Sequence, residues 1–227
     1  MLDRIVEFSQ ALWMLAFLFY AVDVARLIPS GRMLLRERGN DMFVPTLGAF
    51  PFEIAKKELY LAGLLLPWRA ILVARWPDAQ GSTARSDEIN STLTPLRNPT
   101  LTPLRWISGI NFGCLFVLAP VLTHAMGLGV ALLVVVPIVY GANLVAGALV
   151  VRGRARFGIS RGTAASLVVD ALLCAPYGAN WVKRIARLQP ELQPDPATLK
   201  QYLSPADFDR LASVIALRRA DANPKEE

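Results

Sequence analysis

The chain has 227 residues, of which 54% are hydrophobic and 19% charged, and it carries a formal net charge of +6. The apolar share lies above, and the charged share below, the usual values for a soluble domain, which argues against an ordinary soluble protein. The basic residues lie beside apolar segments rather than along one polar face with interleaved aromatic residues, so the pattern argues against a nucleic-acid partner.

The first apolar segment covers residues 8–27, which is long enough to cross a bilayer core, since a crossing takes about 20 residues of helix. Asp3 and Glu7 accompany Arg4 ahead of it, and its end makes a poor cleavage sequence, so a secretory signal peptide is disfavoured. We expect a retained membrane anchor. Asp23, near its end, is a candidate polar residue at membrane depth, where an ionisable group is costly.

Residues 29–104 are expected to form a cytoplasmic insert that ends in a linker. Residues 32–38 and 41–44 flank Gly39-Asn40, a pair that favours a tight turn, and they predict a β-hairpin. From residue 77 to residue 98 the chain is rich in Ser, Thr, Asp, Asn, Gly and Pro, which is typical of a linker.

The middle of the insert is open to two interpretations. Residues 59–66 and 70–73 can add two strands to the hairpin, which would make a small sheet. Alternatively, apolar residues at steps of three and four between residues 52 and 66 predict an amphipathic helix on the membrane surface. We favour strands.

The longest uncharged stretch, residues 106–151, contains no Asp, Glu, Lys or Arg. It is long enough for two membrane-spanning helices and predicts a transmembrane hairpin. The small-residue pair Gly127 and Gly129, beside Thr123 and His124, marks the bend between the two helices.

Within this hairpin, some residues are candidates for contacts between helices. An unsatisfied amide is costly in lipid, so Asn111 and Asn143 should each hydrogen-bond another helix. Small residues four apart let helix backbones approach closely, and they predict packing faces at Gly109 and Gly113 and at Ala142 and Ala146.

The next segment combines a basic loop with a further apolar helix. Arginines are frequent just after the hairpin, and an apolar stretch over residues 163–182 follows, with Asp170 as another candidate polar residue. Because Lys183 and Arg184 follow it, a crossing would place them outside, so we favour an interfacial helix kinked near Pro176 over a fourth span. The loop arginines are Arg152, Arg154, Arg156 and Arg161.

Basic residues also predict the orientation, because Lys and Arg collect on the cytoplasmic side of a membrane. Only Arg4 precedes the first span, whereas four arginines follow it within residues 26–38, so the N-terminus is expected outside. Both ends of the hairpin and the tail over residues 191–227, a helical region with Ser204 as a helix cap, are then cytoplasmic. The Ala-, Leu- and Arg-rich composition suggests a bacterial inner membrane.

Reactive motifs are scarce. The sequence has no metalloprotease, nucleophile-elbow or phosphate-loop motif, and Cys114 and Cys174 form no disulfide or zinc pattern. We predict no catalytic residue, metal or cofactor. The arginine loop can bind anionic lipid headgroups, although fixing the topology requires no such binding.

The sequence thus predicts a mainly α integral membrane protein with three spans, or four as the alternative. A small cytoplasmic insert lies between the first and second spans, and we favour β structure over a helix for it. Its expected partners are the lipid bilayer and a membrane protein or a second copy. The favoured function is a non-catalytic accessory or scaffold protein. The alternatives are a lipid-headgroup-handling enzyme or lipid-binding protein that uses Asp23 or Asp170 with the arginine loop, and a small transporter component that acts as an oligomer. The expected domains are residues 1–28, 29–104, 105–151, 152–190 and 191–227.

Overall fold

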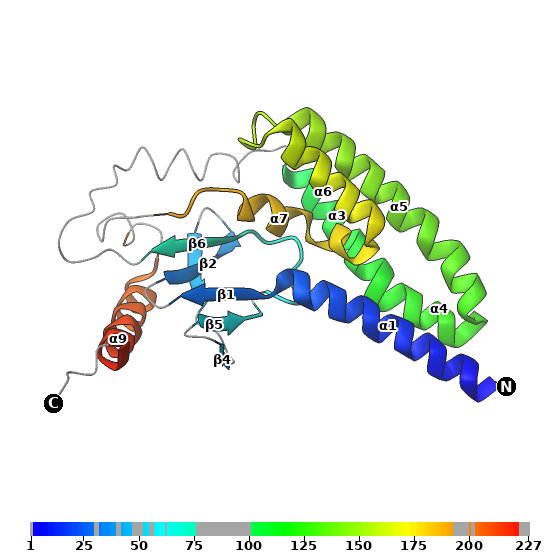
Figure 1. Ribbon diagram of the computed structural model, residues 1–227, viewed down its shortest axis with the longest axis horizontal. Helices are drawn as coiled ribbons and strands as arrows, with labels where there is room; N and C mark the ends of the chain where they lie inside the picture. Colours follow the sequence, from blue (N-terminus) through cyan, green and yellow to red (C-terminus); the bar gives the residue numbers. More distant parts are fainter. Residues whose placement is uncertain are drawn as a thin grey trace. The chain divides into compact units, whose positions relative to one another are not determined.

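The computed structural model describes residues 2–29, 32–39, 42–46, 52–54, 57–61, 63–75, 101–192, 200 and 203–222. The chain is mostly helical and divides into two compact units. Figure 1 colours the ribbon by position in the sequence. The first, here the helical unit, comprises Met1–Val24, Leu64–Trp68 and Asn98–Ile185. The second, here the strand unit, comprises Ala25–Gly63, Arg69–Arg97 and Ala186–Glu227.

The predicted hairpin forms the longest part of the helical unit. Its first arm consists of α3 (Leu101–Gly113), a π-helical turn η1 (Cys114–Leu118) and α4 (Ala119–Met126), and its second arm is α5 (Leu128–Gly153). The arms meet at Gly127, whose φ of 87° lies in the left-handed region that favours glycine. Pro120 has no N–H to donate to the carbonyl four residues earlier, which explains the wider turn η1 before it.

Two helices are long and apolar enough to span a membrane, Leu101–Met126 and Leu128–Gly153. At about 1.5 Å per residue, each 26-residue helix exceeds the roughly 30 Å of a bilayer core. The predicted first span is shorter than expected: α1 (Leu2–Val24) ends three residues early, and its apolar part is Gln10–Val24. The structure therefore supports two spans by length and composition, and the third is not confirmed.

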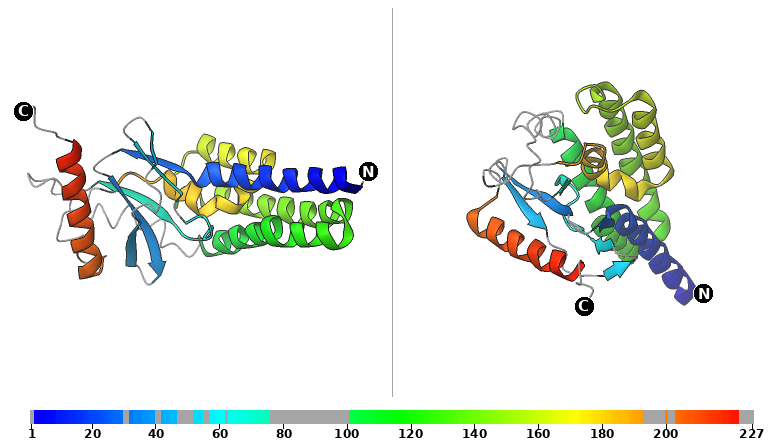
Figure 2. Two further views of the ribbon diagram at one scale, coloured as in Figure 1. Left: turned by 90° about the horizontal axis from the view of Figure 1, so that it is seen from below. Right: turned by 60° about the vertical axis from the view of Figure 1, so that its left-hand side comes forward.

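The apolar stretch over residues 163–182 is not one continuous helix. It is divided into α6 (Arg161–Leu173), a 3₁₀ segment η2 (Ala175–Asn180) and α7 (Trp181–Arg187). Cys174 is extended between α6 and η2, two residues before Pro176. The predicted kink is present, and neither helix has the length of a crossing. Figure 2 shows α1, α3, α4, α5 and α6 lying lengthwise within the helical unit.

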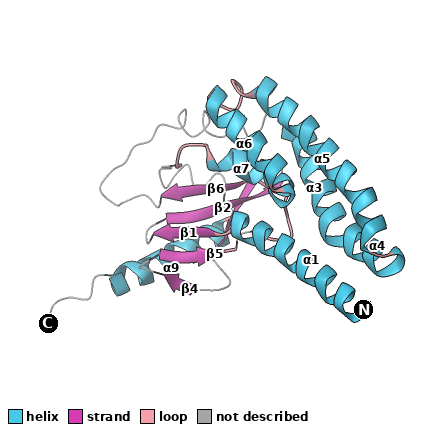
Figure 3. Cartoon of the chain, turned by 45° about the vertical axis from the view of Figure 1, so that its right-hand side comes forward, coloured by secondary structure: helices cyan, strands magenta, loops and turns pink. Residues whose placement is uncertain are grey.

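The strand unit contains two three-stranded antiparallel sheets, drawn in magenta in Figure 3. One has the order β1-β5-β4 and the other β3-β2-β6. Their core includes Ile28, Leu34, Tyr60 and Ile71. The strands are β1 (Arg26–Pro29), β2 (Arg32–Gly39), β3 (Met42–Thr46), β4 (Phe52–Ile54), β5 (Lys57–Tyr60) and β6 (Ile71–Arg75).

The predicted hairpin of the insert is confirmed, because β2 pairs with β3 and Glu37 lies opposite Phe43. The alternative of an amphipathic helix over residues 52–66 is wrong, since this region holds β4 and β5. The strand predicted over residues 59–66 is also misplaced. The backbone leaves β5 after Tyr60 and turns at Gly63, where φ is +63°.

The C-terminal helix is α9 (Pro205–Ala222), and it begins where the sequence predicts. The Oγ of Ser204 accepts a hydrogen bond from the N–H of Asp207 at 3.2 Å, which caps the first turn. Leu203 and Leu211 are buried. The linker over residues 77–98 lies outside the described residues.

Candidate functional site

Polar side chains from six helical segments of the helical unit meet within it. Asn111 on α3, Asn143 on α5 and Asn180 at the end of η2 are completely buried, and Asp23 on α1 is 7% exposed. All four polar residues that the sequence analysis places at membrane depth belong to this group. We define the polar cluster as Asp23, Asn111, Asn143, Asp170, Asn180, Trp181 and Arg184.

Asn143 is the centre of the amide half of the cluster. Its Oδ1 accepts hydrogen bonds from Asn111 Nδ2 at 2.8 Å and from Trp181 Nε1 at 3.2 Å. Its Nδ2 donates to the carbonyl oxygen of Ala171 at 3.1 Å. Asn111 Nδ2 also donates to the carbonyl oxygen of Gly178 at 2.9 Å. One amide side chain therefore joins α3, α5, α6 and α7.

Arg184 is the centre of the ionic half. Its Nη2 donates to Asp170 Oδ2 at 2.7 Å, and its Nε lies 3.6 Å from Asp23 Oδ1. Asn180 Nδ2 donates to the other oxygen of Asp23 at 2.9 Å. The guanidinium lies over the ring of Tyr177 at 4.9 Å. The buried charges of Asp23 and Arg184 are thus paired and hydrogen-bonded, as charges removed from water must be, whereas the Asp170 side chain is 41% exposed.

A second cation lies beside the cluster. Lys183 is 2% exposed, and its Nζ is 5.7 Å from the centre of the Tyr20 ring. The Tyr20 hydroxyl in turn donates to the carbonyl oxygen of Leu64. With Asp23, Asp170 and Arg184, this lysine gives two positive and two negative groups, so the region is balanced in charge.

The arrangement favours a structural use of these polar groups. Each carboxylate faces a hydrogen-bond donor of its own chain, and the amide groups are closed off from solvent. Burial raises the pKa of the Cys174 thiol, which keeps it protonated and weakly nucleophilic. Across the part of the chain that the structure describes, no group of three or more His, Cys, Asp or Glu residues could hold a metal ion.

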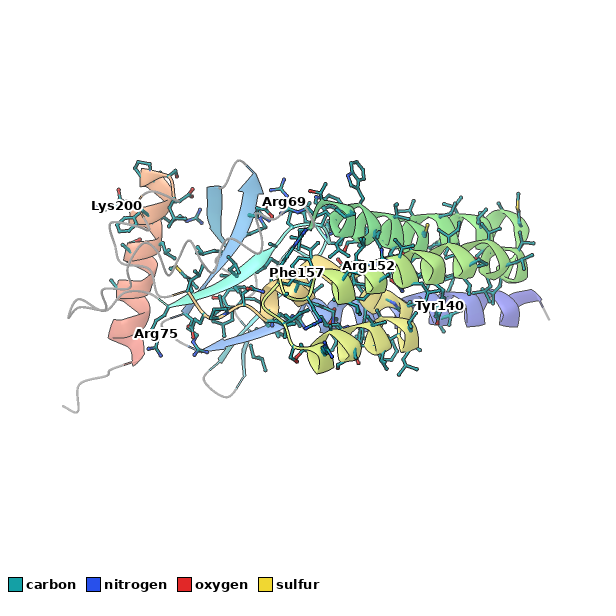
Figure 4. The ribbon with its side chains drawn as sticks, turned by 90° about the horizontal axis from the view of Figure 1, so that it is seen from above. Arg69, Arg75, Tyr140, Arg152, Phe157 and Lys200 are labelled. Carbon is teal, nitrogen blue, oxygen red and sulfur yellow. The ribbon has the colours of Figure 1, made fainter. Side chains whose placement is uncertain are left out.

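The predicted arginine loop joins α5 to α6. Arg152, Arg156 and Arg161 are exposed and Arg154 is half-buried. The loop is packed by the buried Phe157: a Cβ at Gly153 would lie 2.9 Å from the ring of Phe157 (Figure 4). Both Arg161 and Asp170 are on α6. Because a helix rises about 1.5 Å per residue, Asp170 lies about 13 Å beyond Arg161 along the helix axis. The structure therefore does not bring the loop and this carboxylate together.

The small residues proposed for helix packing differ in their surroundings. Ala146 is completely buried and Ala142 is half-buried. A Cβ at Gly109 would contact Trp68 at an ordinary 3.6 Å, whereas one at Gly113 would meet nothing within 4 Å. A closer approach occurs at Gly147, the small residue next to Ala146.

Gly147 on α5 lies against α6. A Cβ at this position would be 3.1 Å from both methyl groups of Val168. We expect Gly147→Ala to lower the free energy of unfolding by about 1 kcal/mol, because an added methyl group overpacks a close contact. Gly113→Ala is the matched control and should have no such cost. Thermal unfolding of both variants in detergent micelles checks this, and equal stabilities would contradict the close packing of α5 on α6.

The pairing of Asn111 with Asn143 gives a second prediction. A double-mutant cycle with Asn111→Ala and Asn143→Ala should give a coupling energy of about 0.5–2 kcal/mol, as expected for a hydrogen bond between helices in lipid. Reversible unfolding of the four proteins in the same bicelles measures it. Additive losses would show that the two amides do not depend on each other.

Sequence reasoning missed the residues that complete the cluster. Lys183 and Arg184 were interpreted only as basic residues that flank an apolar segment. Asn180, Trp181 and Gly178 carried no assigned role. The available signal was the density of polar residues around Pro176 in an otherwise apolar stretch, which marks a broken helix whose backbone needs partners.

Two cavities are lined by described residues of the helical unit, and none of those residues belongs to the polar cluster. The larger, of about 1010 Å³, lies between α1 and the arm formed by α3, η1 and α4, and its lining has no charged side chain. The smaller, of about 530 Å³, lies at the start of α3.

These features define a mostly helical protein with two helices long and apolar enough to span a membrane and a buried, charge-balanced polar cluster. Comparison of the chain with protein-family models, with curated proteins and with solved structures finds no match.

Proposed function

We propose that the chain is a non-catalytic integral membrane protein that acts as an accessory or scaffold subunit. In this proposal α1 is a third crossing, the membrane is a bacterial inner membrane, and the C-terminus lies in the cytoplasm with the N-terminus outside. The protein presents its cytoplasmic surfaces to another membrane protein or to a second copy.

The polar cluster carries the non-catalytic part of the proposal. A catalytic carboxylate must reach a substrate, yet Asp23 is 7% exposed and is held by Asn180 and Arg184. Asp170 is more exposed, but Arg184 Nη2 donates to its carboxylate. The same contacts are what a bundle in lipid needs, because lipid offers no hydrophobic force between helices and polar contacts help to hold them together.

The outer surface supports the membrane part. Large apolar side chains that are mostly exposed include Leu133 at 76% on α5 and Leu173 at 81% on α6. In water such side chains would be an exposed apolar surface, whereas in a bilayer they contact acyl chains. Further examples are Met14, Trp106, Val117, Val121, Leu144 and Val145.

Isolation from the native membrane tests the accessory role. The full chain would be extracted in a mild detergent with its surrounding lipid and its mass measured by native mass spectrometry. We expect a fixed complex with a second polypeptide or a second copy, above the 24.9 kDa of one chain. Isolation of only the lone polypeptide would contradict the proposal.

The rival enzyme function makes a different prediction. A lipid-headgroup enzyme that uses Asp170 and the arginine loop would lose activity in Asp170→Asn and Arg154→Ala cells, which would change the lipid composition of the membrane. We expect both variants to leave that composition unchanged. A changed headgroup profile in either variant, at normal protein level, would favour the enzyme.

A further inference from the structure

The smaller cavity lies where the first arm of the hairpin begins. Six of the described residues line its volume of about 530 Å³, which is within the usual range for a small-molecule pocket. Five of them come from the first turns of α3, and Trp68 comes from the turn at residues 64–68. The lining residues, here the interfacial pocket, are Trp68, Thr102, Arg105, Trp106, Gly109 and Ile110.

The lining changes from polar to apolar along α3. Thr102 and Arg105 lie nearest the start of the helix, and Ile110 lies two turns further on. Arg105 is the only Asp, Glu, Lys or Arg in the candidate span Leu101–Met126, and the uncharged stretch begins at the next residue. Arg105 therefore marks the end of the apolar stretch, where a membrane-spanning helix meets the headgroups.

Two indole rings flank this position. Trp106 is 72% exposed and Trp68 is 38% exposed. Tryptophan is enriched at both membrane surfaces, because its ring is apolar and its N–H can donate to a polar group. A cation, a hydroxyl group and two indoles thus share one pocket whose other end is apolar.

Gly109 keeps the middle of the pocket open. A Cβ at Gly109 would lie 3.6 Å from Cε3 of Trp68, which is ordinary van der Waals contact. Alanine therefore fits at this position, whereas a leucine side chain would extend into the space that Trp68 and Ile110 border. The chain thus offers a pair of substitutions that differ mainly in how much of the pocket they fill.

We propose that the interfacial pocket binds one anionic phospholipid, with the phosphate at Arg105 and Thr102 and an acyl chain against Trp68, Gly109 and Ile110. The proposal rests on the membrane location proposed above. A guanidinium has five N–H donors in a fork that suits phosphate, so Arg105 can bind it while keeping another contact.

Charge complementarity selects the class of lipid. Among the residues that the structure describes, the lining contains one cation and no carboxylate, so it matches a headgroup with net negative charge. The ammonium of a zwitterionic headgroup would meet no acidic partner among these lining residues. The occupant is a lipid rather than a free phosphate, because the apolar end of the pocket needs an acyl chain to cover it.

Native mass spectrometry of the full chain, titrated in detergent with phosphatidylglycerol or with phosphatidylcholine of the same chains, tests the proposal. We expect one tightly bound phosphatidylglycerol and weaker binding of phosphatidylcholine. Arg105→Gln should weaken phosphatidylglycerol binding about tenfold or more, as expected for loss of charge-assisted hydrogen bonds. Arg210→Gln, which removes an exposed arginine of α9 outside the pocket and outside the arginine loop, should leave it unchanged.

The glycine pair tests the apolar end. Gly109→Leu should weaken binding of phosphatidylglycerol, whereas Gly109→Ala should bind it nearly as well as the wild type. Equal effects of Arg105→Gln and Arg210→Gln, or equal binding of the two lipids, would overturn the proposal. Equally strong binding of soluble glycerol phosphate would overturn the lipid assignment.

Flotation with lipid vesicles distinguishes a failure of the pocket proposal from a failure of the proposed membrane location. If the wild type and Arg105→Gln both float while the two arginine variants bind lipid equally, the pocket proposal fails and the membrane location stands. If the wild type does not float, the membrane location itself fails. Arg105 is half-buried and keeps another contact, so the thermal unfolding of Arg105→Gln is measured beside its lipid binding. A stability that matches the wild type confirms that lost lipid binding is local.

Discussion

Asp23→Ala is expected to lower the free energy of unfolding by about 3–5 kcal/mol, the usual cost of removing one partner of a buried ion pair. The side chain of Asp23 is 6% exposed, and that of its partner Arg184 is 12% exposed. The substitution leaves Arg184 with less negative charge nearby and takes the acceptor from Asn180 Nδ2. Reversible unfolding in detergent or bicelles, followed by tryptophan fluorescence, measures the loss.

Asp170→Ala is the matched control, because it removes the other carboxylate that contacts the same arginine. The Asp170 side chain is 41% exposed, so its charge is largely solvated and screened. We expect a loss of about 1 kcal/mol or less. Equal losses for the two variants would show that burial does not set the value of these ion pairs, and that Asp23 does not hold the bundle together.

Gly178→Ala should lower the free energy of unfolding about as much as Asp23→Ala does, by roughly 2–5 kcal/mol. The substitution combines overpacking with the loss of buried hydrogen bonds. A Cβ at Gly178 would overlap the amide group of Asn143. Asn143 would have to move, and with it the hydrogen bonds from Asn111 and Trp181. Loss of thermal stability in micelles, with a normal circular dichroism spectrum at low temperature, is the expected result.

Two further proteins make this test specific. Gly141→Ala adds the same methyl group on α5 where nothing lies within 4 Å, and it should be neutral or slightly stabilising. In Gly178→Ala with Asn143→Ala, the overlapping amide is absent, so the double variant should lose clearly less than the sum of the two single losses. Additive losses would show that the destabilisation by Gly178→Ala does not come from its overlap with Asn143.

The parts of the fold that depend on local chemistry could be predicted from the sequence. Gly127 ends one arm of the hairpin in a backbone conformation that favours glycine, and the uncharged stretch around it is too long for one helix. The β2–β3 hairpin was predicted from its turn sequence, and the break in residues 163–182 from Pro176. Ser204 caps α9 as its position before Pro205 predicts.

The parts that failed depend on tertiary contacts. The end of α1 was placed three residues late, because apolar composition continues past Val24 into β1 and hydropathy does not separate a helix from a strand. The sequence analysis predicted that Asn111 and Asn143 bond other helices, but their spacing says nothing about which residues they meet. Arg184 looked like a topology signal, and only the fold places it between Asp23 and Asp170.

Alkaline carbonate extraction of native membranes tests the central claim, that the hairpin of Leu101–Met126 and Leu128–Gly153 crosses the bilayer. Carbonate strips peripheral proteins but leaves integral ones in the sedimented membrane. We predict that the full chain stays in the pellet with a known multispanning protein of the same membrane. Release of the chain into the supernatant with a known peripheral protein would contradict the claim.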